Sequence, residues 1–458
     1  MSSAEWAAAV PQSTDDKADE RTVRRAVAGA AMGNAVEWFD YAIYSYLVTS
    51  IGLNFFPNAD PTAQTLLTFS LIAIPFALRP LGGIILGPLG DQFGRRRVLA
   101  FTIIMMSAAT FAIGLIPSYA TIGIAAPLLL LLARLVQGFS TGGEYGGAAT
   151  FIAEYAPDKR RGFYGSFLEF GTLGGYVLGA SLATAFQLGL SEQAMNSWGW
   201  RIPFLIAGPL GLIGFYLRNR LEDTPAFVSC ERSGETTTEP FREVIRNVWP
   251  QILNLIGFVI LLNVAVYTLL TYMPTYLTEV LGITESSSLL ILIGVMLGMM
   301  VVITAVGALS DRVGRKPLLL GSAIGFVLLS YPAIRLLENR DVLSVAGGLI
   351  ILAVLLVMML GVIGSALPAM FPTRNRYGGF SIGYSVSTAA FGGTAPVIIS
   401  ALINSTGNNT IPAFYLMTAA AIAIVPILLM PETARISISH PTAIPGAVPV
   451  PAGAGNAQ

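Results

Sequence analysis

Six ionisable residues stand inside segments of the sequence that are otherwise apolar. They are Glu37, Asp40, Arg79, Arg134, Glu144 and Glu169. At a helical rise of about 1.5 Å per residue, Glu37, Arg79 and Glu144 fall at a similar depth, near the middle of a hydrocarbon layer about 30 Å thick. One arginine beside two acids can hold one as a carboxylate and leave the other to gain and lose a proton. We therefore predict that Glu37, Asp40 and Glu144 are proton-coupling residues.

Aromatic and amide side chains accompany these charges. Asn34, Glu37 and Tyr41 share one face of a predicted helix, and Asn263 precedes Tyr267 by about one helical turn in a later segment. Aromatic faces and a carboxylate bind a quaternary ammonium, and an arginine binds a carboxylate. The predicted substrate-binding residues are Trp38, Tyr44, Arg79, Glu144, Glu169, Asn263, Tyr267 and Tyr272, with Phe39 and Phe391 as further candidates for an aromatic cage.

Structural roles are the alternatives for each of these side chains. A single aromatic residue could face lipid or the membrane interface, and the buried charges could form a pair that only fixes helix packing. Arg134 lies near the outer end of its segment and is expected to be an anchor there. Trp198 and Trp200 are expected to belong to an interfacial belt.

The segments that carry these residues are long and apolar. Of the 458 residues, 54% are hydrophobic and 11% are charged, whereas soluble domains contain about 25% charged residues. A membrane-spanning helix takes about 20 apolar residues, and the alternation typical of barrel strands is missing. The sequence predicts an all-α polytopic membrane protein with twelve transmembrane helices, near 24–52, 63–90, 98–117, 122–155, 163–190, 200–219, 249–279, 287–309, 318–337, 343–369, 379–404 and 411–430.

Charge placement predicts the orientation of the chain. The 26 Lys and Arg residues balance 26 Asp and Glu residues, so no basic excess favours nucleic acid. Most of the basic residues fall on one side of the predicted spans, which places both termini in the cytoplasm and the chain in the cell (inner) membrane. Membrane lipid is its expected surrounding, and it is expected to act as a monomer.

Five regions follow from this pattern. We predict a cytoplasmic N-terminal segment at 1–23, a six-helix half at 24–219, a central cytoplasmic loop at 220–248, a second six-helix half at 249–430 and a disordered tail at 431–458. The single cysteine, Cys230, excludes an intramolecular disulfide, and the single histidine, His440, excludes a histidine-built metal site. No metal and no cofactor other than the proton is predicted.

An internal repeat relates the two halves. Gly87-Pro-Leu-Gly-Asp91-Gln-Phe-Gly94-Arg95-Arg96-Arg97 is matched 220 residues later by Gly307-Ala-Leu-Ser-Asp311-Arg-Val-Gly314-Arg315-Lys316-Pro317. Two parallel repeats of six spans are a transporter design, with substrate bound near the midplane between the halves. A carboxylate such as Asp91 or Asp311 at a helix end can accept hydrogen bonds from a helix N-terminus or pair with an arginine. The repeat therefore predicts a gate, although the arginines could also serve only to set topology.

The repeated motif resembles the cytoplasmic signature of the major facilitator superfamily. Further segments resemble its metabolite:proton symporter family, namely 33–40, 78–83, 137–145 and 198–204, and the resemblance covers roughly residues 22–434. It implies gating by Asp91, Arg95, Arg96, Asp311 and Arg315, with Glu154 and Arg161 joining the first-half network. Some members end in a long coiled coil linked to osmotic regulation, which the Pro-, Ala- and Gly-rich tail of this chain cannot form.

The resemblance implies transport rather than enzymatic activity. The expected function is proton symport, by alternating access, of a small zwitterionic compatible solute such as proline or glycine betaine. The alternative within the same family is proton symport of small carboxylates such as 2-oxoglutarate, citrate or shikimate. The acid at Glu169 argues against a dianionic substrate, because uncompensated carboxylates would repel it. An intramembrane enzyme would need a histidine or metal ligands inside the spans, and a receptor would not need duplicated gate motifs.

Overall fold

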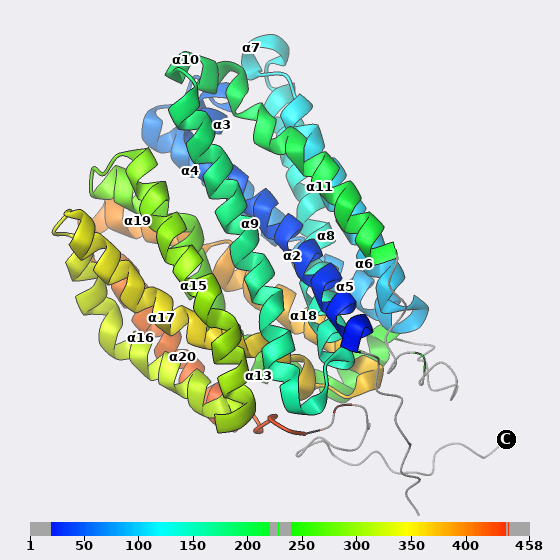
Figure 1. The fold of residues 1–458 in the computed structure, drawn as a ribbon. Coiled ribbons are helices and arrows are strands. Elements are labelled where there is room, and N and C mark those ends of the chain that lie inside the picture. The colour runs from blue at the N-terminus through cyan, green and yellow to red at the C-terminus, as the bar shows by residue number, and fades with distance from the viewer. Residues whose placement is uncertain (1–19, 220–227, 229–239, 437, 439–458) are drawn as a thin grey trace, which may run out of the picture.

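The computed structural model describes residues 20–219, 228, 240–436 and 438. Over these residues the secondary structure consists of helices and contains no strand, in agreement with the predicted class. Figure 1 shows the first-half helices, blue to green, packed beside the second-half helices, yellow-green to red. Helices α7 and α10 lie at one end of the bundle, and the segment after α20 leaves from the other. We call this second end, which carries Asp91 and Asp311, the motif end.

The helices follow the predicted order. The first half contains α2 (Glu20–Tyr46), α3 (Val48–Phe55), α4 (Pro61–Phe76), α5 (Arg79–Phe93), α6 (Arg95–Leu115), α7 (Tyr119–Ile122), α8 (Ala125–Tyr155), α9 (Arg161–Gly189), α10 (Glu192–Ala194) and α11 (Arg201–Asn219). The second half contains α13 (Pro240–Val266), α14 (Met273–Thr275), α15 (Glu285–Val313), α16 (Arg315–Leu337), α17 (Val342–Ala366), α18 (Arg376–Ser387), α19 (Ala395–Thr406) and α20 (Ile411–Leu429). Short 3-10 or π segments join several of them: η1 (Asp158–Arg160), η2 (Met195–Gly199), η3 (Tyr267–Tyr272), η4 (Tyr276–Val280), η5 (Pro368–Met370), η6 (Thr373–Asn375) and η7 (Thr388–Gly392).

Helices occupy all twelve segments that were predicted to cross the membrane. Nine of the described helical stretches are long and apolar enough to do so. The predicted spans at 24–52, 163–190 and 200–219 correspond to α2 with α3, α9 and α11, which fall outside that set. In α2 and α9, polar residues such as Glu37, Asp40 and Glu169 lower the mean hydropathy, and these three are buried in protein. The apolar stretch of α11 is short within the described residues.

Two irregularities in the helices position the centre of the molecule. Helix α4 ends at Phe76 and α5 begins at Arg79, with Pro75 and Pro80 on either side of the break. Proline removes a backbone donor and interrupts a helix. In the second half, α13 passes into the π-helical segment η3 at Tyr267, and such π segments are frequent at functional sites. The side chains of Arg79 and Tyr267, which stand at these irregularities, are both buried.

A helical segment precedes the predicted boundary between the central loop and the second half, whose candidate apolar span begins at Val248, next to the predicted start at 249. Helix α13 begins at Pro240 rather than at 249 and is kinked at Val248, whose φ of −127° and ψ of 17° are not helical. Pro250 follows this kink, which accounts for the interrupted helix. The last part of the predicted loop 220–248 is therefore helical, whereas its residues 220–227 and 229–239 lie outside the described residues. Residues 1–19 of the predicted N-terminal segment and 439–458 of the tail also lie outside them.

Close backbone packing joins the two halves at the motif end. Helices α5 and α8 of the first half pack against α18 of the second half, and α9 packs against α15 and α17. At Gly146 of α8, a Cβ atom would lie 2.1 Å from Ser381 Oγ of α18, so only glycine permits this approach. The seam between the halves is thus closed along α8 and α18.

Candidate functional site

A buried ion pair lies at the centre of the bundle. Arg79 Nη2 of α5 is 3.2 Å from Glu37 Oε1 of α2, and both side chains are inaccessible to solvent. Arg79 Nη1 also donates to Tyr267 Oη of the second half at 3.5 Å. The pair therefore belongs to the first half but touches the second. Desolvated pairs of this kind are costly and mark functional sites in membranes.

Five aromatic side chains surround this pair, and we call them the central aromatic group: Trp38, Tyr41, Phe76, Tyr176 and Tyr267. Trp38 lies 5.4 Å from Tyr176 and 5.9 Å from Tyr267 between ring centroids. Phe76 lies 5.4 Å from Tyr41 and 5.3 Å from Tyr267. The Arg79 guanidinium carbon stands 5.1 Å from the Phe76 centroid and 5.9 Å from that of Tyr41. Both halves thus contribute faces suited to a cation.

Two donors of this centre have no hydrogen-bond partner among the described residues. They are Arg79 Nε and Trp38 Nε1, and both atoms are buried. Buried donors are nearly always satisfied in folded proteins, so orphaned ones suggest a missing acceptor. The centre therefore offers two N–H groups to an anionic oxygen, beside aromatic faces that suit an ammonium group.

Sequence reasoning named Trp38, Arg79 and Tyr267 but missed Phe76 and Tyr176 as members of this group. Phe76 could have been found from its place beside the proline break, three residues before Arg79. Tyr176 is seven residues after Glu169 on α9, which places both on one helix face. Tyr41 shares the predicted helix face with Glu37 but was not predicted to bind substrate.

A second buried network links Asp40 to Arg134. Thr110 Oγ1 donates to Asp40 Oδ2 at 2.5 Å, Gln137 Nε2 donates to Thr110 Oγ1 at 2.5 Å, and Arg134 Nη1 donates to Gln137 Oε1 at 2.9 Å. The Arg134 guanidinium carbon lies 4.0 Å from the Tyr44 centroid. Asp40 and Tyr44 thus belong to this network and not to the central aromatic group.

The expected roles of Arg134 and Trp200 as surface anchors are wrong. Arg134 is 1% exposed and donates to the Leu71 carbonyl oxygen at 3.0 Å, so it cross-links α8 to α4 inside the first half. Trp200 is fully buried and packs edge-on against Phe55 and Phe204, at 5.7 and 6.0 Å between centroids. Trp198 is 49% exposed. Residue counting predicts the position of Arg134 along its helix, but not the direction of its side chain, which points into the first half.

The remaining predicted ligands lie on different contacts. Of the two acids predicted to share Arg79, Glu37 forms the ion pair, whereas Glu144 accepts a hydrogen bond from Thr102 of α6. Glu169 accepts one from Tyr145 Oη at 2.5 Å. Asn263 contacts the neighbouring helix region of its own half, since its Oδ1 accepts from Thr388 Oγ1 at 3.0 Å.

The remaining aromatic candidates, Tyr272, Phe39 and Phe391, are not members of the central aromatic group. The Tyr272 ring lies 6.4 Å from that of Phe69 in the first half. Near it, Ser45 Oγ donates to the Thr271 carbonyl oxygen at 3.0 Å, and Tyr46 Oη donates to that of Leu270 at 2.8 Å. These bonds connect the halves on the side of the centre away from the motif end. Phe39 is fully buried, whereas Phe391 is only partly buried.

The first copy of the repeated motif contacts the second half. Asp91 Oδ2 accepts a hydrogen bond from the backbone N–H of Gly378 at 2.8 Å, in the first turn of α18. Arg95 Nη2 lies 3.6 Å from Asp91 Oδ1 and 3.0 Å from Glu154 Oε1, and Arg376 Nη1 approaches the same Glu154 oxygen at 2.9 Å. Glu154 therefore joins the first-half network as predicted and links two arginines from opposite halves. Arg96 is half-buried beside them.

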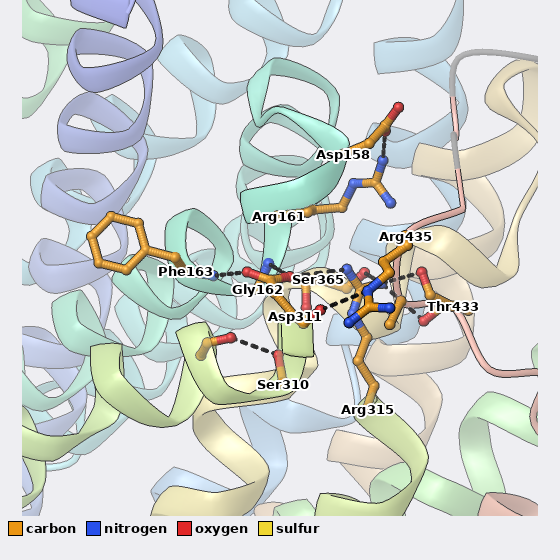
Figure 2. Close-up of polar contacts among 12 residues, drawn as sticks. Asp158, Arg161, Gly162, Phe163, Ser310, Asp311, Arg315, Ser365, Thr433 and Arg435 are labelled. Atoms are coloured by element: carbon orange, nitrogen blue, oxygen red, sulfur yellow. Dashed lines mark hydrogen bonds and ion pairs between the residues drawn. The ribbon is translucent and has the colours of Figure 1, made fainter. Parts of the chain in front are cut away.

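The second copy makes the reciprocal contact, which Figure 2 shows. Asp311 Oδ1 accepts from the backbone N–H of Gly162 at 2.7 Å, and Asp311 Oδ2 accepts from that of Phe163 at 3.0 Å, at the start of α9. Arg315 Nη2 lies 3.9 Å from Asp311 Oδ1. Each half thus places a carboxylate on a helix N-terminus of the other, where the helix dipole favours negative charge. The repeated spacing predicts the carboxylates, and the structure adds their partners.

Arg161 lies in the second network rather than the first. Its guanidinium pairs with Asp158, in the same turn of chain, and Figure 2 shows both beside Asp311 and Arg315. Arg161 Nη1 also donates to the carbonyl oxygen of Ile436 at 2.9 Å. The prediction that Arg161 joins the first-half network with Arg95 is wrong. Arg161 is the first residue of α9, and the N-terminal N–H groups of this helix donate to Asp311.

The beginning of the predicted disordered tail is bound across the motif end. We call residues 432–436 and 438 the C-terminal strap. In the second half, Arg315 Nη1 donates to the Thr433 carbonyl oxygen at 2.9 Å, and Arg435 Nη2 donates to that of Arg312 at 2.9 Å. At its far end the Ile438 carbonyl accepts from Arg376 Nη2 at 2.8 Å, and its side chain packs with Ala153 of the first half.

Glu432 fixes the start of the C-terminal strap. Its carboxylate accepts hydrogen bonds from the backbone N–H of Arg315, at 3.0 Å, and of Lys316, at 3.1 Å, at the N-terminus of α16. Burial acts to raise the pKa of Glu432, but the N–H groups of Arg315, Ala434 and Lys316 hold this pKa below its usual value. The strap therefore begins at a helix cap and ends on the seam between the halves.

Comparison with known proteins identifies close relatives. The family model described as sugar (and other) transporter matches residues 26–248 and 229–443. A glycine betaine/proline/ectoine/pipecolic acid transporter of Dickeya dadantii is 45% identical over 426 residues, which cover 91% of this chain and 85% of the relative. The proline/betaine transporter of Escherichia coli K12 is 44% identical with the same coverage. The ectoine/proline transporter ProP of Corynebacterium glutamicum is 40% identical over 429 residues, 91% of this chain and 85% of the relative.

Solved structures share the fold at low sequence identity. The proton:xylose symporter XylE gives a TM-score of 0.73 at 18% identity, covering 92% of this chain and 98% of that one. The human organic anion transporter MFSD10 gives a TM-score of 0.61 at 15% identity, covering 89% and 99%. The sequence relatives are named as transporters and not as enzymes, and they confirm the resemblance to proline and betaine transporters. The chain belongs to the sugar (and other) transporter family of the major facilitator superfamily.

Proposed function

We propose that this protein is a proton symporter for a small zwitterionic compatible solute such as proline or glycine betaine. It spans the cell (inner) membrane with twelve helices, has both termini in the cytoplasm and works as a monomer by alternating access. In this orientation the motif end faces the cytoplasm. Helices α2 and α9, whose acids Glu37, Asp40 and Glu169 are buried in protein, and α11, whose described apolar stretch is short, complete the nine apolar spans to twelve in this proposal.

The observation that carries the proposal is the composition of the centre. Arg79 Nε and Trp38 Nε1 are buried donors without an acceptor among the described residues, next to the five rings of the central aromatic group. A substrate carboxylate would accept hydrogen bonds from these donors, and a substrate ammonium group would pack against the rings. The relatives named for proline, glycine betaine and ectoine support the same class of solute.

The alternative substrate, a small di- or tricarboxylate, fits this centre less well. A dianion needs a second cation, and among the residues with described burial Arg134 is the other arginine buried within the predicted spans. Its Nε and Nη1 donate to Leu71 and Gln137 and its guanidinium stacks on Tyr44, which leaves Nη2 as its one nitrogen without an acceptor among the described residues. A zwitterion needs only Arg79, because its own ammonium balances its carboxylate.

The Arg79–Glu37 pair provides a route to proton coupling. A substrate carboxylate that binds Arg79 competes with Glu37, whose carboxylate is 3.2 Å from Arg79 Nη2. A carboxylate deprived of its cation in a buried site gains a proton more readily. Substrate and proton therefore enter together, and both leave when Glu37 returns to Arg79. Asp40, bonded to Thr110, and Glu144, bonded to Thr102, are the further proton-coupling residues in this proposal.

Alternating access follows from the contacts on either side of the centre. Asp91 and Asp311 hold the motif end closed, and the bonds of Ser45 and Tyr46 to η3 hold the opposite side. Each set joins one half to the other, so each must break in turn for the centre to open to that side. Arg95, Glu154 and Arg376 add charge pairs to the motif-end contacts.

Uptake into proteoliposomes tests the proposal. The purified chain should accumulate labelled proline or glycine betaine when the pH outside is lowered, and ectoine should compete while 2-oxoglutarate and shikimate should not. Glu37→Gln should abolish accumulation driven by the pH gradient but retain exchange of labelled for unlabelled solute. Failure of the wild-type chain to accumulate either solute would refute the proposed substrate class. Gradient-driven accumulation by Glu37→Gln would refute the role of Glu37.

A further inference from the structure

One buried acid outside the Arg79–Glu37 pair stands next to a contact between the halves. Glu169 of α9 accepts a hydrogen bond from Tyr145 Oη of α8 at 2.5 Å. The Tyr145 ring stacks on the Tyr384 ring of α18, with centroids 4.1 Å apart and planes inclined by 12°. Phe380 of α18 stands edge-on to both rings. The carboxylate is therefore joined to the second half through a single tyrosine.

The stacked tyrosines lie between the centre and the motif end. Helix α8 ends at the motif end at Tyr155, and α18 begins there at Arg376. Tyr145 and Tyr384 are therefore each about 12–15 Å along their helices from that end. The Arg79–Glu37 pair lies further from that end, because Arg79 begins α5 about 21 Å along the helix from its last residue, Phe93. The two rings thus separate the Arg79–Glu37 pair from the motif end.

The neighbouring contacts of α8 and α18 keep this region closed. Ser385 Oγ donates to the Gly142 carbonyl oxygen at 2.9 Å, and Ser381 packs against Gly146. These contacts fix the approach of the two helices to each other. The Tyr145 hydroxyl is bound to a buried carboxylate, and such charge-assisted bonds are short and strong, so this bond helps to hold the ring against Tyr384.

We propose that Tyr145 and Tyr384 form an inner gate between the substrate site and the motif end, and that Glu169 is the positioning residue that keeps it shut. This inference rests on the proposed transport function, because a gate has meaning only for a solute that passes. Glu169 then acts on the solute through Tyr145, in place of the direct substrate contact predicted from the sequence. Removal of the hydrogen bond loosens the gate and leaves the binding groups at Arg79 untouched.

Accessibility of a buried seam residue tests the gate without any solute. In a chain whose native cysteine is removed by Cys230→Ala, Ser381→Cys places a thiol on α18 that is buried while the seam is closed. In nanodiscs, Tyr145→Phe, which loses a hydrogen bond to a charged group, should speed alkylation of this thiol by a maleimide roughly tenfold. Glu169→Gln, whose amide oxygen can still accept a weaker bond from Tyr145, should speed alkylation by a smaller factor. Proline counterflow measured on the same variants should show a nearly unchanged half-saturating concentration and an altered turnover rate.

Matched variants separate this role from the alternatives. Tyr331→Phe removes a phenol hydroxyl from α16, where the side chain is 42% exposed, and should leave alkylation unchanged. Glu169→Asp, which withdraws the carboxylate by one methylene, should accelerate alkylation if Glu169→Gln does not fold. Unchanged alkylation in Tyr145→Phe would overturn the gate. A much higher half-saturating concentration in Glu169→Gln, with unchanged alkylation, would instead make Glu169 a substrate ligand. Because alkylation needs no solute, accelerated alkylation supports the gate even if proline is not carried.

Discussion

The reciprocal carboxylate contacts at the motif end predict unequal effects of two equivalent substitutions. Asp311 uses both oxygens to accept backbone N–H groups of α9, at 2.7 and 3.0 Å, whereas Asp91 accepts one from α18 at 2.8 Å. Substitution by asparagine replaces one oxygen by an amide nitrogen that cannot accept. Both variants lose the attraction of the carboxylate to its arginine, Arg315 or Arg95. In addition, Asp311→Asn loses one hydrogen bond and weakens the other, whereas Asp91→Asn can rotate and keep its single bond in a weaker form.

The size of the difference follows from ordinary hydrogen-bond energies. A hydrogen bond to a charged group contributes about 1.5–3 kcal/mol and a neutral one about 0.5–1.5 kcal/mol. We expect Asp91→Asn to destabilise the closed motif end by about 1 kcal/mol, and Asp311→Asn by about 2 kcal/mol or more. The ratio of closed to open molecules should then fall roughly 5-fold and 30-fold, respectively.

Distances between spin labels measure this ratio directly. Phe93 at the end of α5 and Val313 at the end of α15 are equivalent in the two repeats and are 53% and 55% exposed, so both can carry labels. The matched control is Asp341→Asn, because Asp341 caps α17 away from the motif end by accepting from the Ser344 N–H at 2.9 Å. Equal changes of the closed-to-open ratio in Asp91→Asn and Asp311→Asn, or a larger change in Asp91→Asn, would refute the reasoning from the number of hydrogen bonds.

Three further predictions concern the centre, the seam and the strap. Arg79→Lys should raise the half-saturating concentration of proline in counterflow roughly tenfold or more, because an ammonium cannot reproduce the fork of a guanidinium; an unchanged value would indicate a packing role. Gly146→Ala brings a Cβ to 2.1 Å from Ser381 Oγ, so label distances at the motif end should lengthen. A label distance in Gly146→Ala equal to that of the closed wild-type chain, together with normal uptake, would contradict this prediction. Deletion of residues 434–458 removes the Arg161–Ile436 hydrogen bond and the Ile438–Ala153 packing, which join the strap to the first half, and should lower the closed fraction several-fold in the same label measurement; an identical distribution would show that the strap adds no closing energy.

The sequence predicts the carboxylate and arginine positions at the motif end well because the chemistry of the repeated motif is local. The glycines, the carboxylate and the arginine of each motif occupy consecutive turns of chain, so a repeat at a fixed offset places both copies at equivalent helix ends. The identity of the contacted helix is a long-range property. Nothing in the residues around Asp311 indicates that α9, about 150 positions earlier, supplies the N–H groups.

The centre was predicted less completely because residue counting gives depth and not direction. Glu37, Arg79 and Glu144 were placed at one depth, and the structure pairs the first two while Glu144 contacts α6. For the same reason the sequence wrongly predicts that Arg134 is an anchor at the outer end of its segment, although its side chain points into the first half. A rotation of one helix by a third of a turn changes such partners without changing any depth.

Composition leads to a wrong prediction of disorder at the start of the tail, because the contacts there are made by backbone carbonyl groups. A segment rich in Pro, Ala and Gly cannot build a core of its own, but its carbonyl groups can accept from arginines that the bundle already presents. Arg161, Arg315 and Arg376 each donate to a carbonyl of the C-terminal strap. Order is therefore supplied by the arginines of the helices and not by the tail.

The C-terminal strap also has a practical consequence for experiments on this protein. Its last described residue, Ile438, lies on the seam between the halves, which parts at the motif end in the proposed transport cycle. A fluorescent protein or purification tag joined shortly after this residue would pull on that seam, and its bulk would bias measured transport rates. The same arrangement makes the position an attachment point for a force probe. Tension applied there would be transmitted to the seam through the strap, and the force needed to detach the strap would measure how firmly it is held.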